Sequence, residues 1–187
     1  MSSLAQRHLS RTAIWQSTGS CCIWRHPVPP PPAIPGQPTF VASDPEEGPE
    51  PLVVVWRDGS VSALCGHVDL GTGLRTALTQ IVAEELDVGM QAVHLIMGST
   101  QAAPNQGATI ASTSIQIHAE PLRRAAAQAR ALLIQGLCER WGCALDEVQS
   151  QDGIFSAGTH QASLGEAVPA GGLRAELDLN TPIKPAH

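Results

Sequence analysis

Two stretches of small and hydroxyl-bearing residues in this 187-residue sequence have the composition of ligand-binding loops. The first runs from Gly66 to Gly73 and lies between a predicted strand and a predicted helix. Glycine lets the backbone approach a ligand closely, and free N–H groups at a helix N-terminus attract anions. The spacing is not that of the dinucleotide fingerprint, and the Gly-Lys-Ser/Thr sequence of a P-loop does not occur. From spacing alone, a ligand loop and a tight structural turn are equally good interpretations.

The second stretch runs from Gly107 to Ser114 and also leads into a predicted helix. Its hydroxyl groups can cap that helix, or they can bind a polar ligand together with exposed backbone N–H groups. Capping is the default interpretation of one such loop. Two helix entrances of this kind in one small domain favour a shared anionic ligand.

Other residues with reactive side chains form weaker patterns. Cys138 and Cys143 do not have the C-x-x-C spacing of a metal site, so we expect packed thiols and no metal site. An odd total of five cysteines argues against a disulfide scaffold and favours a reducing compartment. His67 lies in the first loop, where it could touch a ligand, whereas His94 and His118 fit buried or surface positions.

Composition excludes two classes of function. The net charge is −6 and Lys184 is the only lysine, so the chain lacks the basic surface that binds nucleic acid. Every apolar run is interrupted well before the roughly 20 residues that a membrane helix needs. We therefore expect no nucleic acid partner and no membrane span.

The chain divides into two parts. Residues 1–50 are predicted to be a disordered tail, because prolines dominate from Pro27 onward and an acidic patch follows at residues 44–47. This Pro-rich arm is interpreted as a spacer, although it could dock on an aromatic groove of a partner. Residues 51–187 have the hydrophobic pattern of a folded domain.

The folded part is predicted to be a small α+β domain with β-hairpins and two main helices. The Asp-Gly pairs at Asp58 and Asp152 each lie between short apolar runs, which is the pattern of a hairpin turn. Pro121 should kink the second helix or start a new one, and Arg123 and Arg124 fit a solvated helix edge. The predicted elements are a hairpin from Leu52 to Leu64, a helix over 74–86, a strand over 93–97, a helical region over 112–141, a second hairpin around Gly153, and a weakly structured tail from Thr159 with a short helix over 163–167.

The two loops and the segments between them resemble the xanthine dehydrogenase and aldehyde oxidase family of molybdenum hydroxylases. The resemblance is to the molybdopterin-binding large subunit, especially bacterial forms of the isoquinoline 1-oxidoreductase and nicotinate dehydrogenase kind. It extends from about Leu52 to Pro185 and is carried by Asp58-Gly59, by residues 66–86 and by residues 107–115. It implies that the chain is part of a larger molybdopterin-binding domain.

The resemblance also implies which residues touch the cofactor. The family's first loop reads Glu-Leu-Gly-Gln-Gly, and its glutamine contacts the molybdenum cofactor. This chain has Asp69-Leu70-Gly71-Thr72-Gly73, so the shorter Thr72 replaces that amide. The second loop matches the family pattern through residues that should lie against the pterin and its phosphate. The implied cofactor-binding residues are Gly71, Thr72, Gly73, Thr109, Ala111, Ser112 and Ser114.

For function, the resemblance implies hydroxylation of N-heterocycles or aldehydes, with water as the oxygen source. It implies a molybdopterin cofactor, in its plain or its cytosine dinucleotide form, and a small-molecule substrate. The family's glutamate base lies beyond the matched segment, so this N-terminal portion is expected to carry no catalytic residue and to be inactive alone. Glu166 follows Leu-Gly as that base does, but the family has an ordinary surface helix at this position.

Partners and location follow from the same resemblance. The expected partners are the remainder of the molybdopterin-binding subunit and a [2Fe-2S] subunit. A cytoplasmic location is expected, with the periplasm as the alternative. A second hypothesis, from another class, is a non-catalytic α+β interaction module whose Pro-rich arm binds a partner and whose glycine loops are only turns.

Overall fold

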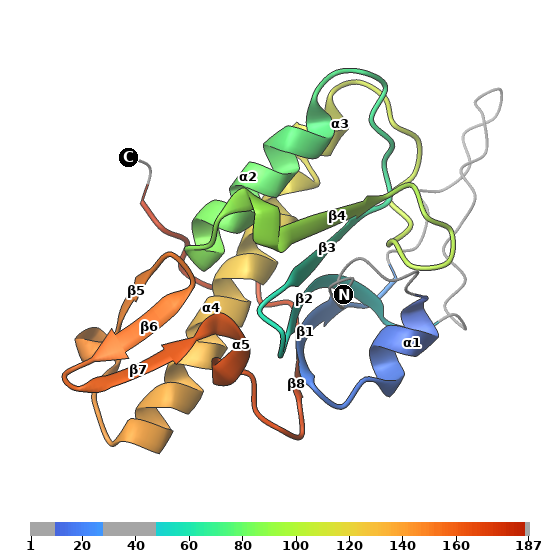
Figure 1. The fold of residues 1–187 in the computed structure, drawn as a ribbon. Coiled ribbons are helices and arrows are strands. Elements are labelled where there is room, and N and C mark those ends of the chain that lie inside the picture. The colour runs from blue at the N-terminus through green and yellow to red at the C-terminus, as the bar shows by residue number, and fades with distance from the viewer. Residues whose placement is uncertain (1–9, 28–47, 186–187) are drawn as a thin grey trace, which may run out of the picture.

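A five-stranded mixed sheet forms the centre of the protein in the computed structural model, which describes residues 10–27 and 48–185 (Figure 1). The strand order is β4-β3-β2-β1-β8. β2 is antiparallel to both neighbours, whereas β4 is parallel to β3 and β8 is parallel to β1. The strands are β1 (Ser20–Arg25), β2 (Glu50–Trp56), β3 (Val61–Cys65), β4 (Val93–Met97) and β8 (Leu173–Glu176).

The first predicted hairpin is confirmed. β2 and β3 are joined by a turn in which Gly59 has φ +81°, a conformation that glycine adopts without strain. The backbone N–H of Trp56 donates to the carbonyl of Ser60 at 2.9 Å and closes the turn. Asp58 contributes its carboxylate, which accepts from the Ser60 N–H at 3.0 Å.

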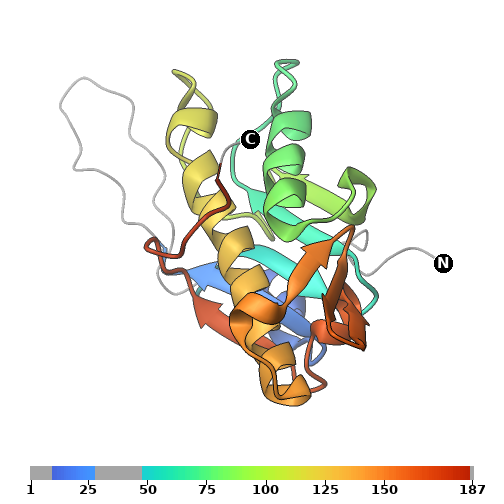
Figure 2. The ribbon, with the colours of Figure 1, turned by 90° about the vertical axis from the view of Figure 1, so that its left-hand side faces the viewer.

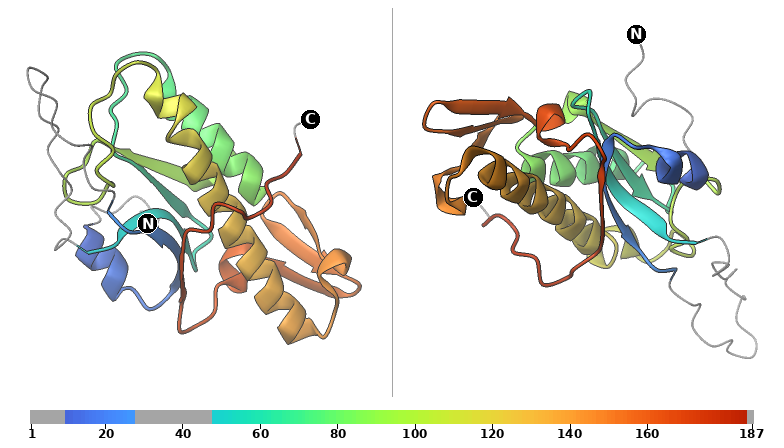
Figure 3. Two further views of the ribbon diagram at one scale, coloured as in Figure 1. Left: turned by 180° about the vertical axis from the view of Figure 1, so that it is seen from behind. Right: turned by 90° about the horizontal axis from the view of Figure 1, so that it is seen from below.

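Helices cover both faces of the sheet. α2 (Leu74–Leu86) and α4 (Ala119–Trp141) lie side by side on one face (Figure 2), and α1 (Arg11–Gln16) lies on the other (Figure 3). Because side chains alternate along a strand, β2 serves both layers. Val53 and Val55 pack in the core under α2 and α4, whereas Val54 packs with Ile14 of α1.

A new helix begins at Ala119, close to Pro121, so of the two predicted outcomes, a kink or a new helix, the structure has the second. The helical region divides into α3 (Thr113–Gln116) and α4, and Pro121 is the third residue of α4. In the first turn of a helix the missing N–H of proline removes no intrahelical hydrogen bond. α4 ends at Trp141, and the next residue, Gly142, forms a left-handed cap with φ of +69°.

The second Asp-Gly turn is also confirmed and belongs to a small separate sheet. Asp152 and Gly153 both have positive φ, as a tight two-residue hairpin turn requires. Near it, Gly165 at the start of a short helix would place a Cβ atom 2.4 Å from the Arg57 carbonyl, so only glycine fits there. The elements are β5 (Gln149–Gln151), β6 (Ile154–Ala157), β7 (His160–Ser163), α5 (Leu164–Ala167) and the 3₁₀ helices η3 (Met90–Ala92) and η4 (Leu145–Glu147).

Two parts of the sequence are more ordered than predicted. Within the predicted tail, residues 11–25 form α1 and β1, and β1 lies between β2 and β8 with Cys21, Cys22 and Ile23 fully buried. After Thr159, residues 160–163 and 173–176 add the strands β7 and β8. β1 and β8 are stabilised by pairing with segments distant in sequence, whereas β7 forms a local hairpin with β6. The proline run and the acidic patch at 44–47 lie outside the described residues.

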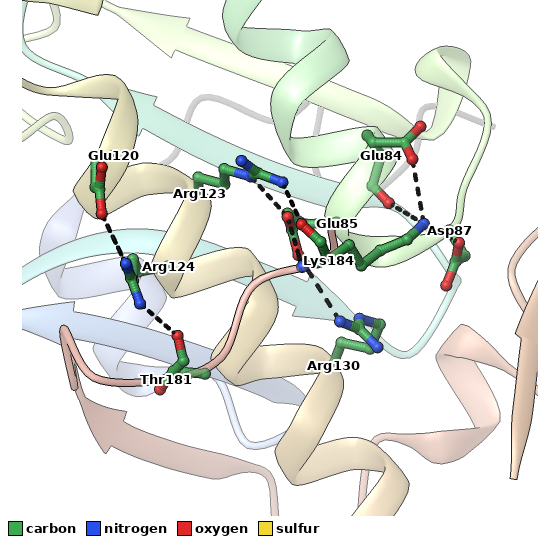
Figure 4. A network of polar contacts seen from close by, with 9 residues as sticks. All are labelled: Glu84, Glu85, Asp87, Glu120, Arg123, Arg124, Arg130, Thr181 and Lys184. Carbon is green, nitrogen blue, oxygen red and sulfur yellow. Dashed lines mark hydrogen bonds and ion pairs between the residues drawn. The ribbon is translucent and has the colours of Figure 1, made fainter. Parts of the chain in front are cut away.

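Arg123 and Arg124 do not form a solvated edge, which corrects the prediction for that face of α4. Arg123 donates to the buried carboxylate of Glu85 at 2.7 Å and to the Lys184 carbonyl at 2.8 Å (Figure 4). Arg124 donates to the Thr181 carbonyl at 2.8 Å and pairs with Glu120. These bonds hold the last described segment of the chain across α2 and α4.

Candidate functional site

The two glycine- and hydroxyl-rich loops meet at one end of the sheet. β3 leads into the first loop (residues 66–73), and β4 leads into a segment that starts at residue 98 and ends in the second loop (107–114). These two strands are parallel neighbours. Their carboxyl ends therefore lie at the same sheet edge, where open α/β sheets commonly bind ligands. The Val68 N–H donates to the Thr109 hydroxyl at 3.0 Å, so a side chain of one loop is bonded to the backbone of the other.

Close backbone contact explains the first glycine of the loop. A Cβ atom on Gly66 would lie 2.0 Å from the carbonyl oxygen of Pro104, a distance that no side chain tolerates. The Gly66 N–H donates to the side-chain oxygen of Gln106 at 2.7 Å. The second loop is thus packed directly on the first, and the arrangement requires glycine at position 66.

An ion-pair cluster fixes the second loop from behind. The buried Glu50 carboxylate pairs with Arg25 at 3.0 Å and with Arg11 at 3.4 Å, and it accepts from the backbone N–H of Asn105 at 2.7 Å. Arg11 also donates to the Ala103 carbonyl at 2.8 Å. The ordered N-terminal elements therefore position a loop that contributes to the candidate site, a link that the sequence did not reveal.

Asp69 occupies the N-terminus of α2, which the sequence had left open to an external anion. Its carboxylate accepts from the backbone N–H groups of Gly71, Thr72 and Arg75, each at 3.0 Å. These bonds, first among them the one from Arg75, lower the pKa of the Asp69 carboxyl below its usual value. The helix begins after Gly73, and its N-cap residue makes no side-chain capping bond.

A pocket of about 300 Å³ lies between the two loops. It contains five of the seven residues implied by the family resemblance, namely Thr72, Thr109, Ala111, Ser112 and Ser114. Gly71 and Gly73 lie beside it and form the turn, with φ of +85° and +76°. The rest of the lining is apolar and comprises Val68, Leu70, Leu74, Ala77, Ile110 and Ile115.

The second loop is held in an uncommon backbone conformation where it lines the pocket. Ala111 and Ser112 have φ of +50° and +57°, which costs a non-glycine residue about 1 kcal/mol or more. Strained residues of this kind are frequent at ligand sites. Ser112 is exposed, and its hydroxyl makes no capping bond to α3. Capping is therefore not the role of this hydroxyl, which can bind a ligand in the pocket.

Ser114 is the buried hydroxyl of the pocket, and its partner is His67. The His67 ring is fully buried, with Nδ1 2.6 Å from the Ser114 hydroxyl and Nε2 3.1 Å from the Gln106 carbonyl. His118 packs edge-to-face against it at 4.6 Å, and burial, followed by the neighbouring His67 and Arg25, lowers the pKa of His118 to about 4. His67 is therefore a buried residue that holds the pocket residue Ser114 in place. The sequence had indicated only that His67 could touch a ligand.

Residues outside the pocket have structural roles. The Glu166 carboxylate accepts from the backbone N–H of Ser163 at 2.8 Å and caps α5, which lowers its pKa and gives it the role of a helix cap. All five cysteines are free, and burial raises the pKa values of Cys21 and Cys22 to about 12, as expected for packed thiols.

Within the described residues, no group of three His, Cys, Asp or Glu side chains has the arrangement of a metal site. No helix of the described part is long and apolar enough to cross a membrane.

A domain whose two adjoining loops form a hydroxyl-lined pocket at a sheet edge has the general form of a cofactor-binding module. Comparison with known proteins identifies the kind. The profile of the molybdopterin cofactor-binding domain matches residues 29–180. The chain therefore belongs to this family, and the resemblance drawn from the two loops is confirmed.

Individual relatives agree with the family assignment. The chain is 46% identical over 134 residues to a nicotinate dehydrogenase subunit of Pseudomonas putida, across 71% of this chain and 11% of that protein. It is 33% identical over 130 residues to the beta subunit of isoquinoline 1-oxidoreductase from Brevundimonas diminuta, across 64% and 16% respectively. Reconstituted CO dehydrogenase from Oligotropha carboxidovorans has a similar fold, with a TM-score of 0.55 at 21% identity over 62% of this chain and 15% of that one. The chain thus spans a small part of each relative.

The pocket residues fit one part of molybdopterin better than another. Four hydroxyl side chains and an apolar wall suit the edge and face of a planar heterocycle. No arginine or lysine lines the pocket, and Asp69 already occupies the N-terminus of α2, so a phosphate would find little positive charge there. A volume of 300 Å³ is at the lower end for ligand sites and accommodates a ring system, with the rest of a larger cofactor outside.

Proposed function

We propose that this chain forms part of the molybdenum-cofactor site of a molybdenum hydroxylase, an oxidoreductase that hydroxylates N-heterocycles or aldehydes with oxygen from water. The observation that carries the proposal is the pocket between two family-matching loops, which brings together Thr72, Thr109, Ala111, Ser112 and Ser114. When bound, the molybdenum cofactor supplies the redox chemistry of the hydroxylation. The residues of this chain bind and orient it.

Each loop has a distinct part in this role. The first loop supplies Thr72 and the apolar side chains of Val68 and Leu70, which exclude water from one face of the bound ring. The second loop supplies Ser112, whose hydroxyl is exposed and makes no capping bond. Where the family has a glutamine, this chain has Thr72, whose side chain is shorter and ends in a hydroxyl. A direct hydrogen bond from Thr72 therefore requires the cofactor to lie closer to this loop.

The finer features of the assembly belong to the same proposal. We infer that the cofactor is molybdopterin, with the cytosine dinucleotide form as the larger variant, and that the chain works with the remainder of a molybdopterin-binding subunit and a [2Fe-2S] subunit. The support is that the relatives are named as subunits and that this chain covers 11% to 16% of their length. Five free cysteines support a cytoplasmic location, with the periplasm as the alternative.

The alternative of a non-catalytic interaction module has less support. It depended on the Pro-rich arm, which lies outside the described residues, and on glycine loops that serve only as turns. The family membership and the strained backbone at Ala111 and Ser112 both favour a ligand site instead.

A pair of alanine substitutions tests the proposal. Ser112→Ala removes the exposed pocket hydroxyl and keeps a Cβ atom at the same positive φ, so the backbone strain is unchanged. We expect the assembled complex to retain about tenfold less molybdopterin, because a hydrogen bond to a bound group contributes about 1 to 1.5 kcal/mol. Thr159→Ala, on an exposed turn of the small sheet, is the matched control and should change nothing. Equal molybdopterin content in both variants and the wild type would refute the proposal.

Gly71→Val is a poorer test than Ser112→Ala. Gly71 has φ of +85°, which a valine resists, and its N–H is bonded to Asp69. That substitution would distort the whole loop, so a loss of cofactor would not report on a contact.

A further inference from the structure

Cys138 and Cys143 lie together at the C-terminal end of α4, although they lack the C-x-x-C spacing. The chain reverses there through the left-handed Gly142, and the backbone N–H of Cys143 donates to the Cys138 carbonyl at 3.3 Å. This is the long hydrogen bond of a Schellman motif, which brings the residue after the glycine against the last turn of the helix. The two thiols also share a hydrogen bond. The helix cap therefore holds them as a pair.

The two thiols of this pair differ in exposure. Cys138 is 7% exposed, and its thiol donates to the Ala144 carbonyl at 3.5 Å. Burial, followed by the hydrogen bond with Cys143, raises the pKa of Cys138 and keeps it protonated at neutral pH. Cys143 is partly exposed. A dissolved oxidant therefore meets Cys143 first, with the Cys138 sulfur beside it.

The other three cysteines are not placed for such a reaction. Cys21 and Cys22 are neighbours on β1, where successive side chains point to opposite faces, and they pack in separate core clusters. Cys65 donates to the side-chain oxygen of Gln106 at 3.3 Å. All three are buried and serve as internal controls.

We propose that Cys138 and Cys143 form a reversible dithiol that a hydroperoxide, such as hydrogen peroxide, oxidises to an intrachain disulfide. The Cys143 sulfur attacks one peroxide oxygen, the O–O bond breaks, and a sulfenic acid and one water molecule result. The Cys138 sulfur then attacks the Cys143 sulfur, and the S–S bond forms as the hydroxyl leaves with the Cys138 hydrogen as a second water. Each thiol loses one hydrogen, and hydrogen peroxide is reduced to two water molecules.

The disulfide protects Cys143 from irreversible oxidation, because a sulfenic acid without a neighbouring thiol proceeds to sulfinic acid. A small thiol such as glutathione reverses it by exchange. The pair lies at the end of α4 that is remote from the two loops, and the 23 residues of this helix span about 34 Å (Figure 2). The inference is thus independent of the proposed function, and oxidation of the pair should leave cofactor content unchanged.

Trypsin reports the bond directly, because it cleaves after Arg140, between the two cysteines. The reduced full chain is treated with hydrogen peroxide under conditions that oxidise N-acetylcysteine, alkylated, and digested after the monomer has been isolated. We expect peptide 131–140 to be linked to peptide 141–174, and dithiothreitol to release both. Unlinked peptides, whether their cysteines are alkylated or Cys143 carries a sulfinic acid, would overturn the inference.

Two serine variants test the order of the steps. Cys138→Ser removes the second thiol, so we expect the sulfenic acid of Cys143 to persist and to be trapped by dimedone, which gains no adduct in the wild type. Cys143→Ser is the matched control and should give neither a link nor an adduct. Equal dimedone labelling of the wild type and Cys138→Ser would overturn the inference, as would equal oxidation of Cys21 and Cys22. If Cys138→Ser does not fold, the linked wild-type peptides decide the question.

Discussion

The Glu85 carboxylate should contribute more to stability than any surface charge near it. Its side chain is 0% exposed, and it accepts from Arg123 at 2.7 Å and from the Lys184 backbone N–H at 3.2 Å (Figure 4). Arg130 approaches its other oxygen at 3.8 Å. The neighbouring Glu84 pairs with the Lys184 ammonium at 3.3 Å, but its side chain is 59% exposed. Adjacent residues of one helix thus offer a buried and an exposed ion pair for comparison.

The expected cost follows from burial. Removing one member of a buried ion pair costs about 3 to 5 kcal/mol, because the other charge is left without compensation. In Glu85→Gln the stranded guanidinium of Arg123 is 31% exposed and water can solvate it in part, so we expect a loss of about 2 to 3 kcal/mol. Glu84→Gln should cost about 0 to 1 kcal/mol, as exposed pairs do.

Urea unfolding of the full chain, followed by the fluorescence of its four tryptophans, measures both values. Equal m-values in the two variants would show that the denatured state is unchanged and that the midpoints report stability. A Glu85→Gln variant within about 0.5 kcal/mol of the wild type would contradict the reasoning. So would a Glu84→Gln variant that loses as much.

Three further predictions concern titrating groups. The pKa of Asp69 should lie below its usual 3.8, so its contribution to stability is present above that pH and is lost as pH falls through the folded value; a carboxyl NMR titration with a midpoint at or above 3.8 would contradict this. The pKa of His118 should be about 4 in an NMR titration of the folded protein. The free energy of unfolding should fall as the pH drops from 6.5 towards 4, because over this range His118 is protonated in the unfolded state and not in the folded state. A midpoint near 6.5 would contradict this. At pH 8 a thiol reagent should label the partly exposed Cys143 first and reach Cys21 and Cys22 only on unfolding; rapid labelling of all three in the native state would show that β1 is not buried.

Local signals in the sequence predicted much of the fold. Both Asp-Gly hairpins, the helix over 74–86 and the strand over 93–97 form as expected. Each is specified by residues adjacent in sequence, such as the positive-φ glycine of a tight turn or apolar residues at helical spacing. The division at Pro121 is of the same kind.

Long-range pairing accounts for the elements that were missed. β1 and β8 are four to six residues long and lie at opposite ends of the chain, yet they pair with each other in parallel. Their sequences carry no strong strand pattern, and the Pro-rich arm beside β1 favoured a disordered tail. Burial between β2 and β8 overrides that local preference.

The candidate site also combines residues that local sequence predicts with residues that only long-range contacts reveal. Five pocket residues were named from the loop motifs, because family patterns are local in sequence. The partners that fix them were not, since His67 meets Ser114 across 47 positions and Glu50 meets Asn105 across 55. The capping role of Asp69 was also missed, although its signal is local, since an acidic residue shortly before a helix is a frequent N-terminal cap.

The most direct test of the central claim is the molybdopterin and molybdenum content of the complex that this chain forms in its native host. The chain is tagged, its partners are identified by mass spectrometry, and both cofactor components are quantified on the same sample. Large partners that supply the rest of a molybdopterin-binding subunit, with molybdenum near one per complex and with less in Ser112→Ala, are the predicted result. A complex without molybdopterin, or a chain recovered alone and free of metal, would contradict the assignment of the pocket as a cofactor site.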